Sequence, residues 1–477
     1  MKKLLAIVIS MAMVVAMMPM GVFAADDNCV AEINGEHYQT LQAAVDAVKT
    51  GETITLVKSF STEDQIEITD KQITLDLNGN SLTKINDENK KGSDLALIYV
   101  HSGSEGTAEG KVTIIDTKGE GKLISNYDNI LYLNGGTIEQ VSGTVESTGY
   151  WIYGEQAYGN VIVNVLGSET DVENYSEFIM GKDAVISSLK TTTDYEHVGC
   201  GYVMVGPVGP KGNRSAFGAN MNISGRIENA VLYVNGQIVK STGNVPNFNV
   251  HNTAVVNGGI YAAGYAKWNI EGANITGATG IEIRAGELTV SDNAKITGTS
   301  VPTTVTPNGN GSTTDGAGIA IAQHDTKLPI DVKISSGDIK GFSALYESNP
   351  QGSSAENIAK VKIAVSGGTF TAINGGTNAI YSEDKGNFIT GGTYSDLSAV
   401  DYLGDNAKVK INLNDSVTMG KMLTVPENAT LTLNTNGKTI TNEVGNYAIN
   451  NLGTMTINGG GKIIRNNAGN SAIRTIG

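Results

Sequence analysis

Four aromatic residues stand close together in the first third of the chain: Tyr150, Trp151, Tyr153 and Tyr158. Aromatic rings present flat apolar faces, which stack on sugar rings as they do on other flat groups. The cluster is therefore a candidate carbohydrate-binding site. The alternative is that the same residues fill the interior of the fold or pack beneath a loop, and the residue types alone favour that interpretation.

Two other segments could carry chemistry. Tyr261, Tyr265 and Trp268 form a second aromatic group, to which the same two interpretations apply. The segment Asp194–Cys200 (DYEHVGC) brings together a carboxylate pair, a histidine and a thiol. Acid–base or Cys/His chemistry there would need partners from elsewhere in the chain. We favour the interpretation that this segment is a solvated loop with one buried cysteine.

Motifs for metals and cofactors are missing from the sequence. It contains no zinc-ligand spacing, EF-hand loop, Walker loop or nucleophile elbow. We therefore predict no metal and no cofactor, and we assign no catalytic residue.

Short strands are the elements that would position these residues. Apolar and polar residues alternate in several segments, and a period of two puts one set on a buried face and the other on a wet face. We predict that the apolar sets share one interior and that the charged residues beside them point outward. The apolar residues are Val161, Val163, Val165, Ile281, Ile283, Val361, Ile363 and Val365, and the charged ones are Arg284, Lys362 and Lys410.

One pattern recurs along the chain, in which alternating apolar residues are followed by a polar residue and glycine. Examples are ITLDLNG at 73–79, AVVNGGI at 254–260 and MTINGG at 455–460. Parallel strands need crossover connections, yet almost no helical pattern lies between these segments. A coil of strands stacked on itself solves this, because its inner strands are paired on both edges. The sequence thus predicts an all-β solenoid, a parallel β-helix.

A single helix is predicted, over residues 40–49. Leu41, Ala44, Val45 and Val48 recur at helical spacing, with Thr40 as N-cap and a glycine just beyond the end. The end of a solenoid exposes an apolar cross-section and open strand edges. Because this helix directly precedes the first strands, we expect it to cap them.

The segment INGEHYQTLQAAVDAVKTGETITL at 33–56, continued through ITLDLNGNSL at 73–82, resembles the start of secreted proteins with a pectate-lyase-like right-handed β-helix. Such proteins are common on the surfaces of Gram-positive gut-type bacteria. The segments GGTF at 367–370 and GGTY at 391–394 resemble their repeats. The resemblance covers essentially the whole mature chain. It implies a right-handed parallel β-helix with a short N-terminal capping helix, and it says little about activity.

Enzymes of that fold carry motifs that this chain lacks. The Asn-Thr-Asp, paired Asp-Asp, Gly-His-Gly and Arg-Ile-Lys motifs of polygalacturonase-like hydrolases are absent, and none of the five arginines stands in a lyase-like arginine motif. Our first hypothesis is a non-enzymatic surface protein that acts in adhesion, glycan contact or as a stalk. The alternative is a polysaccharide lyase or glycoside hydrolase whose site residues are not recognisable. A third is a repeat domain whose activity lies beyond residue 477.

The first residues predict export. Lys2 and Lys3 precede an apolar run that is too short to span a membrane comfortably, and small residues end it, so we place a signal peptide at 1–24. Cleavage removes two of the 33 basic residues and none of the 48 acidic ones, which takes the formal charge from −15 to −17. We therefore expect a secreted or surface-attached protein with no membrane span after cleavage. Its partners would be glycans or host and cell-surface components, and not nucleic acid.

The mature chain divides near Val400 in this interpretation. Residues 73–83 (ITLDLNGNSLT) resemble 431–441 (LTLNTNGKTIT), which suggests one β-helix over 25–400 and the start of a second over 401–477, apparently truncated. The alternative is that 431–441 is simply another turn of one coil. Cys29 and Cys200 are too few for a disulfide framework, and we favour two unpaired thiols in a monomer.

Overall fold

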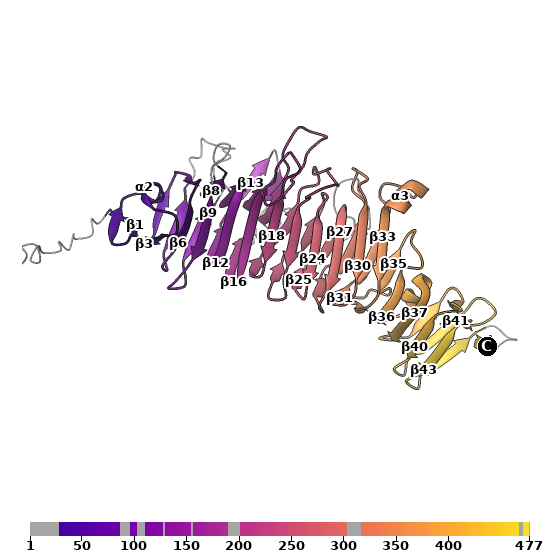
Figure 1. Ribbon diagram of the computed structural model, residues 1–477. Coiled ribbons are helices and arrows are strands. Elements are labelled where there is room, and N and C mark those ends of the chain that lie inside the picture. The colour runs from indigo at the N-terminus through magenta and orange to yellow at the C-terminus, as the bar shows by residue number, and fades with distance from the viewer. Residues whose placement is uncertain are drawn as a thin grey trace, which may run out of the picture.

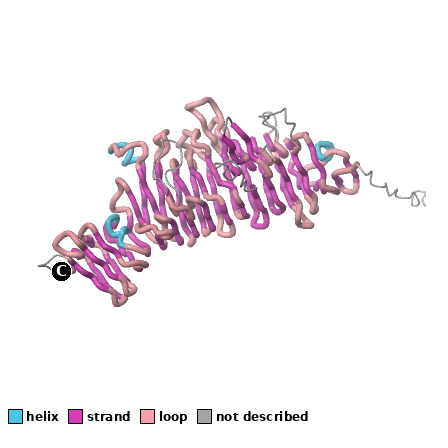
Figure 2. Tube along the Cα trace, turned by 180° about the vertical axis from the view of Figure 1, so that it is seen from behind, coloured by secondary structure: helices cyan, strands magenta, loops and turns pink. Residues whose placement is uncertain are grey.

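The protein is described by a computed structural model over residues 28–85, 96–102, 110–126, 129–153, 156–188, 201–302, 316–466 and 471–476; of residues 150–153 and 156–159 it describes the backbone alone. Over these residues the chain forms an elongated stack of short strands (Figure 1). The helices are short and lie at the margins of the stack (Figure 2). The predicted all-β class is confirmed.

The coil has three sides, and most complete turns contribute one strand to each. Side one contains β3 (Thr53–Leu56), β6 (Gln72–Asp76), β9 (Lys111–Ile115), β12 (Gly136–Ser147), β16 (Ser176–Ser188), β18 (Ala219–Ile223), β21 (Asn247–Val250), β24 (Lys267–Glu271), β27 (Gly286–Ser291), β30 (Ile330–Ile334), β33 (Val361–Val365) and β36 (Ile389–Tyr394). Side two contains β4 (Phe60–Thr62), β7 (Ser81–Lys84), β10 (Lys122–Ser125), β19 (Arg226–Glu228), β22 (Val255–Asn257), β25 (Asn274–Gly277), β28 (Lys295–Gly298), β31 (Asp338–Gly341), β34 (Thr369–Ala372), β37 (Leu403–Asn412), β40 (Thr430–Asn434) and β43 (Thr454–Asn458). The long strands β12, β16 and β36 turn the corner and join these two sides into one sheet.

Side three is a separate sheet. It contains β5 (Ile66–Ile68), β8 (Ile98–His101), β11 (Leu131–Asn134), β15 (Val161–Leu166), β17 (Gly201–Gly206), β20 (Ala230–Val234), β23 (Ile260–Ala262), β26 (Ile281–Ile283), β29 (Ile319–Ala322), β32 (Leu345–Ser348) and β35 (Ile380–Ser382). On all three sides, the described strands pair in parallel with those of the turns before and after. Antiparallel strand pairs occur at the first strand, β1 (Ala31–Ile33), and in a hairpin of β13 (Tyr150–Tyr153) and β14 (Gln156–Gly159). The predicted parallel β-solenoid is confirmed.

Apolar side chains from the three sides fill the interior of the coil. Six of the eight residues that alternation predicted to be interior are buried: Val163, Val165, Ile281, Ile283, Val361 and Val365. The prediction for Val161 was wrong. Pairing with β17 shifts between Val161 and Val163, and Ile162 is fully buried while Val161 is only half-buried. Ile363 is half-buried and packs against the core.

The prediction for Arg284 was also wrong, because its side chain is fully buried. The guanidinium Nη1 donates to Glu282 Oε1 at 3.0 Å, and Nη2 donates to the carbonyl of Gln323 at 3.4 Å. The segment after β29 thus lies over this part of side three and removes water from it. Where no loop covers the sheet, alternation holds: Lys362 and Lys410 are exposed, as predicted.

The predicted capping helix is present as α2 (Leu41–Ala47), two residues shorter at its end than the prediction. Thr40 is the N-cap, and its Oγ1 accepts from the backbone N–H of Ala43 at 3.2 Å. Leu41, Ala44 and Val45 form its buried face and join the main core. The helix therefore covers the apolar cross-section at the first turn.

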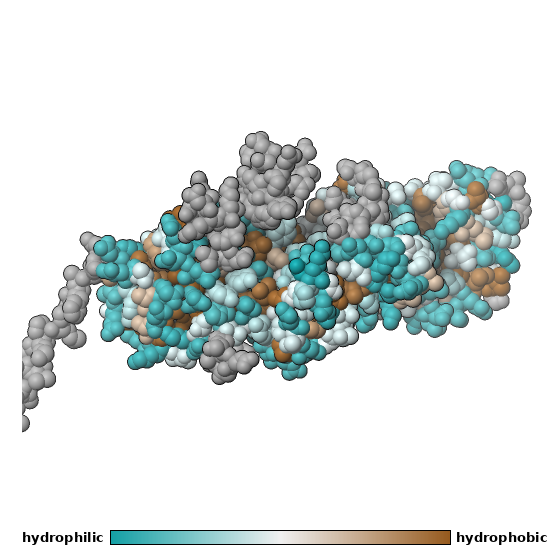
Figure 3. Space-filling view, turned by 90° about the horizontal axis from the view of Figure 1, so that it is seen from above, coloured by the Kyte–Doolittle hydropathy of each residue, from teal (hydrophilic) through white to brown (hydrophobic). Residues whose placement is uncertain are grey.

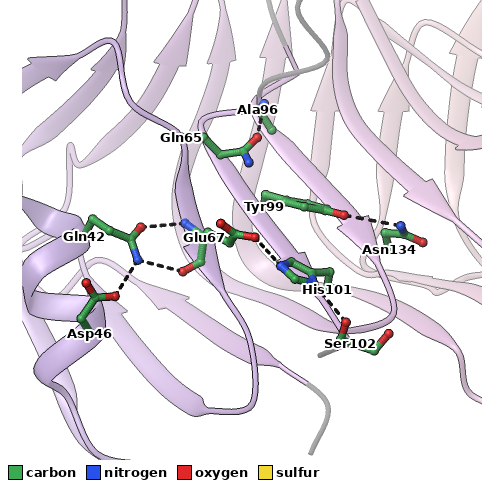
Figure 4. A network of polar contacts seen from close by, with 9 residues as sticks. All are labelled: Gln42, Asp46, Gln65, Glu67, Ala96, Tyr99, His101, Ser102 and Asn134. Carbon is green, nitrogen blue, oxygen red and sulfur yellow. Dashed lines mark hydrogen bonds and ion pairs between the residues drawn. The ribbon is translucent and has the colours of Figure 1, made fainter. Parts of the chain in front are cut away.

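α2 also closes the first strand edge of side three (Figure 4). The side-chain amide of Gln42 makes both edge hydrogen bonds of Glu67 in β5: Nε2 donates to the Glu67 carbonyl at 3.2 Å, and Oε1 accepts from the Glu67 N–H at 2.8 Å. Asp46 Oδ1 also accepts from Gln42 Nε2, at 2.9 Å, which orients the amide. One side chain thus takes the place of a missing neighbouring strand.

The opposite edge of side three is closed in the same manner. The 3₁₀ helix η1 (Leu397–Tyr402) follows β36, and its N-cap Asp396 accepts from the N–H of Ala379 at 2.6 Å. Ser398 Oγ accepts from the N–H of Ile380, and Tyr402 Oη from that of Ser382, both at 3.0 Å. Side three therefore begins and ends on strands whose outer edges are bonded by side chains.

After η1 the coil continues at an angle to the main stack (Figures 1 and 2). Side two runs on through β37, β40 and β43, while two new sheets form. The new strands are β38 (Val417–Met419), β41 (Thr439–Asn442) and β44 (Lys462–Arg465), and β39 (Leu423–Val425), β42 (Ile449–Asn451) and β45 (Ile473–Thr475). The two similar sequence motifs also make the same turn: Asn78 and Asn436, both with φ 50°, donate to the carbonyls of Leu56 and Leu413.

Candidate functional site

The predicted carbohydrate-binding residues lie on the β13–β14 hairpin. Trp151 is the register partner of Tyr158, and Tyr153 that of Gln156, while Tyr150 pairs with Gly159. The hairpin leaves the coil between β12 and β15, and β14 contacts β17. Because only the backbone is described here, the proposed stacking of these rings on sugars stays a prediction.

Of the other two predicted clusters, only the second aromatic group lies within the described residues. Asp194–Cys200 lies outside the described residues. The second aromatic group is spread over different environments. Trp268 is buried in the interior, where its ring centroid lies 3.8 Å from that of Phe248. Tyr261 stands on side three. Tyr265 alone lines a surface cleft.

The outer face of side one carries a row of polar side chains in register across six turns. We call this set the polar row. Its residues are Asn220, Asn247, Lys267, Glu287, Asp331 and Lys362. Neighbouring strands of a sheet lie about 4.8 Å apart, so the row extends about 24 Å along the coil. All six side chains are half-buried or exposed.

A second row of asparagines runs beside the first, two residues further along each strand. Asn249 Nδ2 donates to Asn222 Oδ1 at 2.9 Å, and Asn269 Nδ2 donates to Asn249 Oδ1 at 2.9 Å. Asn222 Nδ2 in turn donates to Glu177 Oε1 at 2.9 Å. An amide has two acceptor lone pairs and two donor hydrogens, so each of these groups keeps capacity for a ligand. The bonds between turns fix the orientation of the amides.

One end of the polar row lies in a cleft of about 340 Å³, which we call the amide cleft. Its polar lining consists of Glu173, Asn174, Asn220, Asn244, Asn247 and Lys267. The wall opposite the sheet is a loop fixed by Asp171, whose Oδ1 accepts from the N–H of Asn244 at 2.8 Å. A Cβ at Gly243, where φ is +85°, would collide with that carboxylate, so glycine is required at this turn.

The other end lies in a cleft of about 330 Å³, the charged cleft. Glu287, Asp331 and Lys362 form its floor, and Tyr265 forms part of its wall. The Tyr265 hydroxyl donates to Glu287 Oε1 at 3.4 Å, and Lys333 Nζ lies 3.1 Å from Asp331 Oδ2. Burial, reinforced by the nearby carboxylates of Glu287 and Asp331, raises the pKa of Tyr265, so its hydroxyl stays a donor at neutral pH.

Side three carries a different group at its first turns (Figure 4). His101 Nε2 lies 2.6 Å from Glu67 Oε1, and the His101 ring stacks on Tyr99 with centroids 4.6 Å apart. Asn134 bonds the Tyr99 hydroxyl from the next turn at 3.4 Å. Tyr99 and His101 both stand on β8, so each ring has one face against the other, and the Tyr99 hydroxyl is also engaged. This group is less suited than the polar row to holding an extended ligand.

The surface seen in Figure 3 is mainly polar, with apolar residues scattered between polar ones. Among the described residues there is no group of three or more His, Cys, Asp or Glu side chains placed to hold a metal ion. The described chain also contains no helix of the length and apolar character that crossing a membrane requires. Cys29 is buried and unpaired in the described structure.

Comparison with protein-family models, with curated proteins and with solved structures finds no match for this chain.

The polar row escaped prediction although its signal is visible in the sequence. The strands read ANMNI at 219–223, NFNV at 247–250 and KWNI at 267–270, with polar residues at every second position. Alternation shows that these residues share the outer face. It does not show which strands are neighbours, because loops of variable length separate them, and so the row becomes visible only in the folded coil.

Proposed function

We propose that the protein is a secreted or cell-surface solenoid that binds a neutral glycan along side one without cleaving it. The single observation that carries this proposal is the polar row, which joins the amide cleft to the charged cleft in one register. The signal-peptide pattern of residues 1–24 supports export. The resemblance to surface β-helix proteins is in keeping with such a role.

The spacing of the row suits a linear polymer of sugars. Each turn advances the row by about 4.8 Å, close to the advance of one extended pyranose unit, so one side chain faces each successive sugar. Amides donate and accept at once, which matches the hydroxyl and acetamido groups of neutral sugars. The overall charge of −15 disfavours an acidic polymer.

One observation favours a second candidate, a glycoside hydrolase. Glu287 and Asp331 are register partners on neighbouring turns in the charged cleft, and retaining glycosidases hold two carboxyl groups about 5 Å apart. Such an enzyme needs one protonated and one ionised carboxyl group, and different environments around the two groups keep their pKa values different. Here both residues are half-buried and lie on the same floor. We therefore rank hydrolysis second.

Glycan-array screening followed by calorimetric titration tests binding. The informative variant is Asn247→Ala with Lys267→Ala, which removes two donors shared by the amide cleft and the polar row. Loss of two hydrogen bonds of about 0.5–1.5 kcal/mol each weakens binding by about 5-fold to 150-fold. Asn257→Ala is the matched control, because Asn257 is an outward, half-buried asparagine of side two, bonded to Glu228 at 2.8 Å.

Two further measurements distinguish binding along side one from binding at the hairpin and from hydrolysis. Trp151→Ala tests the hairpin as a binding site, and we expect it to weaken binding less than the Asn247→Ala, Lys267→Ala variant does. If the Asn247→Ala, Lys267→Ala variant binds as wild type does and Trp151→Ala loses binding, the site lies on the hairpin instead. A reducing-end assay on any bound polymer tests turnover; product formation that disappears in Glu287→Gln would establish the hydrolase instead.

A further inference from the structure

Tyrosines recur at one outward register position of side three, so that several rings lie above one another along the coil. Tyr233 and Tyr261 are register partners, with ring centroids 5.5 Å apart and planes inclined by 6°. Tyr346 and Tyr381 repeat the arrangement at the far end, at 5.0 Å and 16°. Parallel register stacks like side chains face to face, because each turn repeats the backbone of the last.

The Tyr346–Tyr381 pair differs from the Tyr233–Tyr261 pair in its access and its isolation, because Tyr202 also lies beside Tyr233. Tyr381 is 37% exposed, whereas Tyr233 and Tyr261 are both half-buried. Tyr381 stands in β35, the last strand of side three, and the register neighbour of Tyr346 on its other side is Ala320. An oxidised ring at this site therefore has one tyrosine as its stacked partner in the sheet.

We propose that Tyr346 and Tyr381 are an oxidative cross-linking site, at which a peroxidase and hydrogen peroxide join the two rings as dityrosine. Each phenol loses one electron and one proton, which gives two tyrosyl radicals. The radicals couple through the carbons ortho to their hydroxyls, forming one C–C bond. Those two carbons then lose their hydrogens as the phenols are restored. The peroxide takes up two electrons and two protons, its O–O bond breaks, and two water molecules form.

Protonation and geometry agree with this route. Burial, with Tyr381 and Glu383 nearby, raises the pKa of Tyr346 to about 12, so at neutral pH the ring is a neutral phenol that must lose its proton as it is oxidised. The ring centroids already lie 5.0 Å apart, and Tyr381 is the exposed ring, so coupling requires its side chain to rotate until the ortho carbons meet. The resulting bond would join β32 to β35 across the turn that contains α3 (Ala355–Lys360), β33 and β34.

The cross-link would act as a covalent staple between turns. Closing residues 346–381 into a loop restricts the unfolded chain, as a disulfide does. We expect the oxidised protein to unfold at a higher temperature than the untreated protein.

The test treats the full chain with a haem peroxidase and limiting hydrogen peroxide. Dityrosine fluorescence and a mass lower by two hydrogens, both in the monomer, are expected, with a cross-linked peptide pair containing residues 346 and 381. Tyr346→Phe and Tyr381→Phe keep the stacked rings but remove the phenol, so each should lose most of the signal and the gain in thermal midpoint. Tyr233→Phe is the control and should retain both.

Three outcomes would overturn the proposal. They are cross-links found only between molecules, a signal that persists in Tyr381→Phe, and peptide mapping that joins Tyr381 to Tyr402 of η1 instead of Tyr346. Because phenylalanine preserves packing, a loss of signal in these variants is not explained by misfolding, and circular dichroism of each variant checks this directly.

Discussion

Replacing Gln42 by alanine tests how the solenoid closes its first strand edge. The variant removes the two hydrogen bonds, of 3.2 and 2.8 Å, that the Gln42 amide makes to the Glu67 backbone. Net contributions are about 0.5–1.5 kcal/mol per bond. Water can reach the freed groups, which places the total at the low end, at about 1–2 kcal/mol of unfolding free energy.

The assay combines urea denaturation with amide hydrogen exchange. We expect a lower unfolding midpoint in Gln42→Ala and faster exchange at the Glu67 amide, because an open edge strand loses its protection. Lys49→Ala is the control, since Lys49 is an exposed residue just past the end of α2, and we expect a change within about 0.5 kcal/mol.

Deleting residues 40–49 enlarges the perturbation. It also exposes the apolar cross-section beneath Leu41 and Val45, and we expect aggregation. Wild-type stability and Glu67 exchange in Gln42→Ala, or a deletion variant that stays monomeric and equally stable, would contradict this role of α2.

Three further predictions concern the interior and its turns. Burial raises the pKa of the Glu347 carboxyl in the folded chain, so the folded protein loses stability as the pH rises from the unfolded-state pKa through the folded-state pKa. Glu347→Gln should flatten this pH dependence and should require more denaturant than wild type to unfold at neutral pH, as parallel denaturation series at several pH values would show. Trp268→Ala removes a fully buried ring that stacks on Phe248, and should lower the unfolding free energy by about 3–5 kcal/mol; Trp268→Phe should lower it markedly less. Equal losses for the two variants in urea titrations would show that the Trp268 ring is not packed in the interior as described. Asn436→Ala, at φ 50°, should cost about 1–3 kcal/mol and Asn436→Gly less, and the opposite order in thermal melts would show that the turn is not strained.

The alternation of apolar residues was enough to predict the strands, because it depends only on which side chains leave the pleat on the same face. Thr40 and the spacing from Leu41 to Val48 likewise predicted the cap, since helix capping is local in sequence. Arg284 shows where such reasoning fails: its strand face is outward, yet a segment that begins about 40 residues later covers it. Coverage by loops is a tertiary property that alternation does not encode.

The candidate site shows the same division between local and long-range information. Outward polar residues can be identified within each strand, but the polar row forms only when strands up to 44 residues apart become neighbours, as Glu287 and Asp331 do. Aromatic residues stand out in a sequence, which drew the prediction to the hairpin at Tyr150–Tyr153. The asparagine, lysine and acidic residues of the polar row are common on protein surfaces, and only their arrangement across turns makes them a candidate site.

The length dependence of glycan affinity shows whether a ligand lies along side one. Neutral oligosaccharides of two to eight units, of the type selected by the array, would be titrated into the full chain by calorimetry. The polar row predicts that affinity rises with each added unit until one sugar faces each of the six side chains, at about six units over about 24 Å, and then levels off. Affinity that is already constant at two units, or that does not change in the Asn247→Ala, Lys267→Ala variant at any length, would contradict a ligand bound along side one.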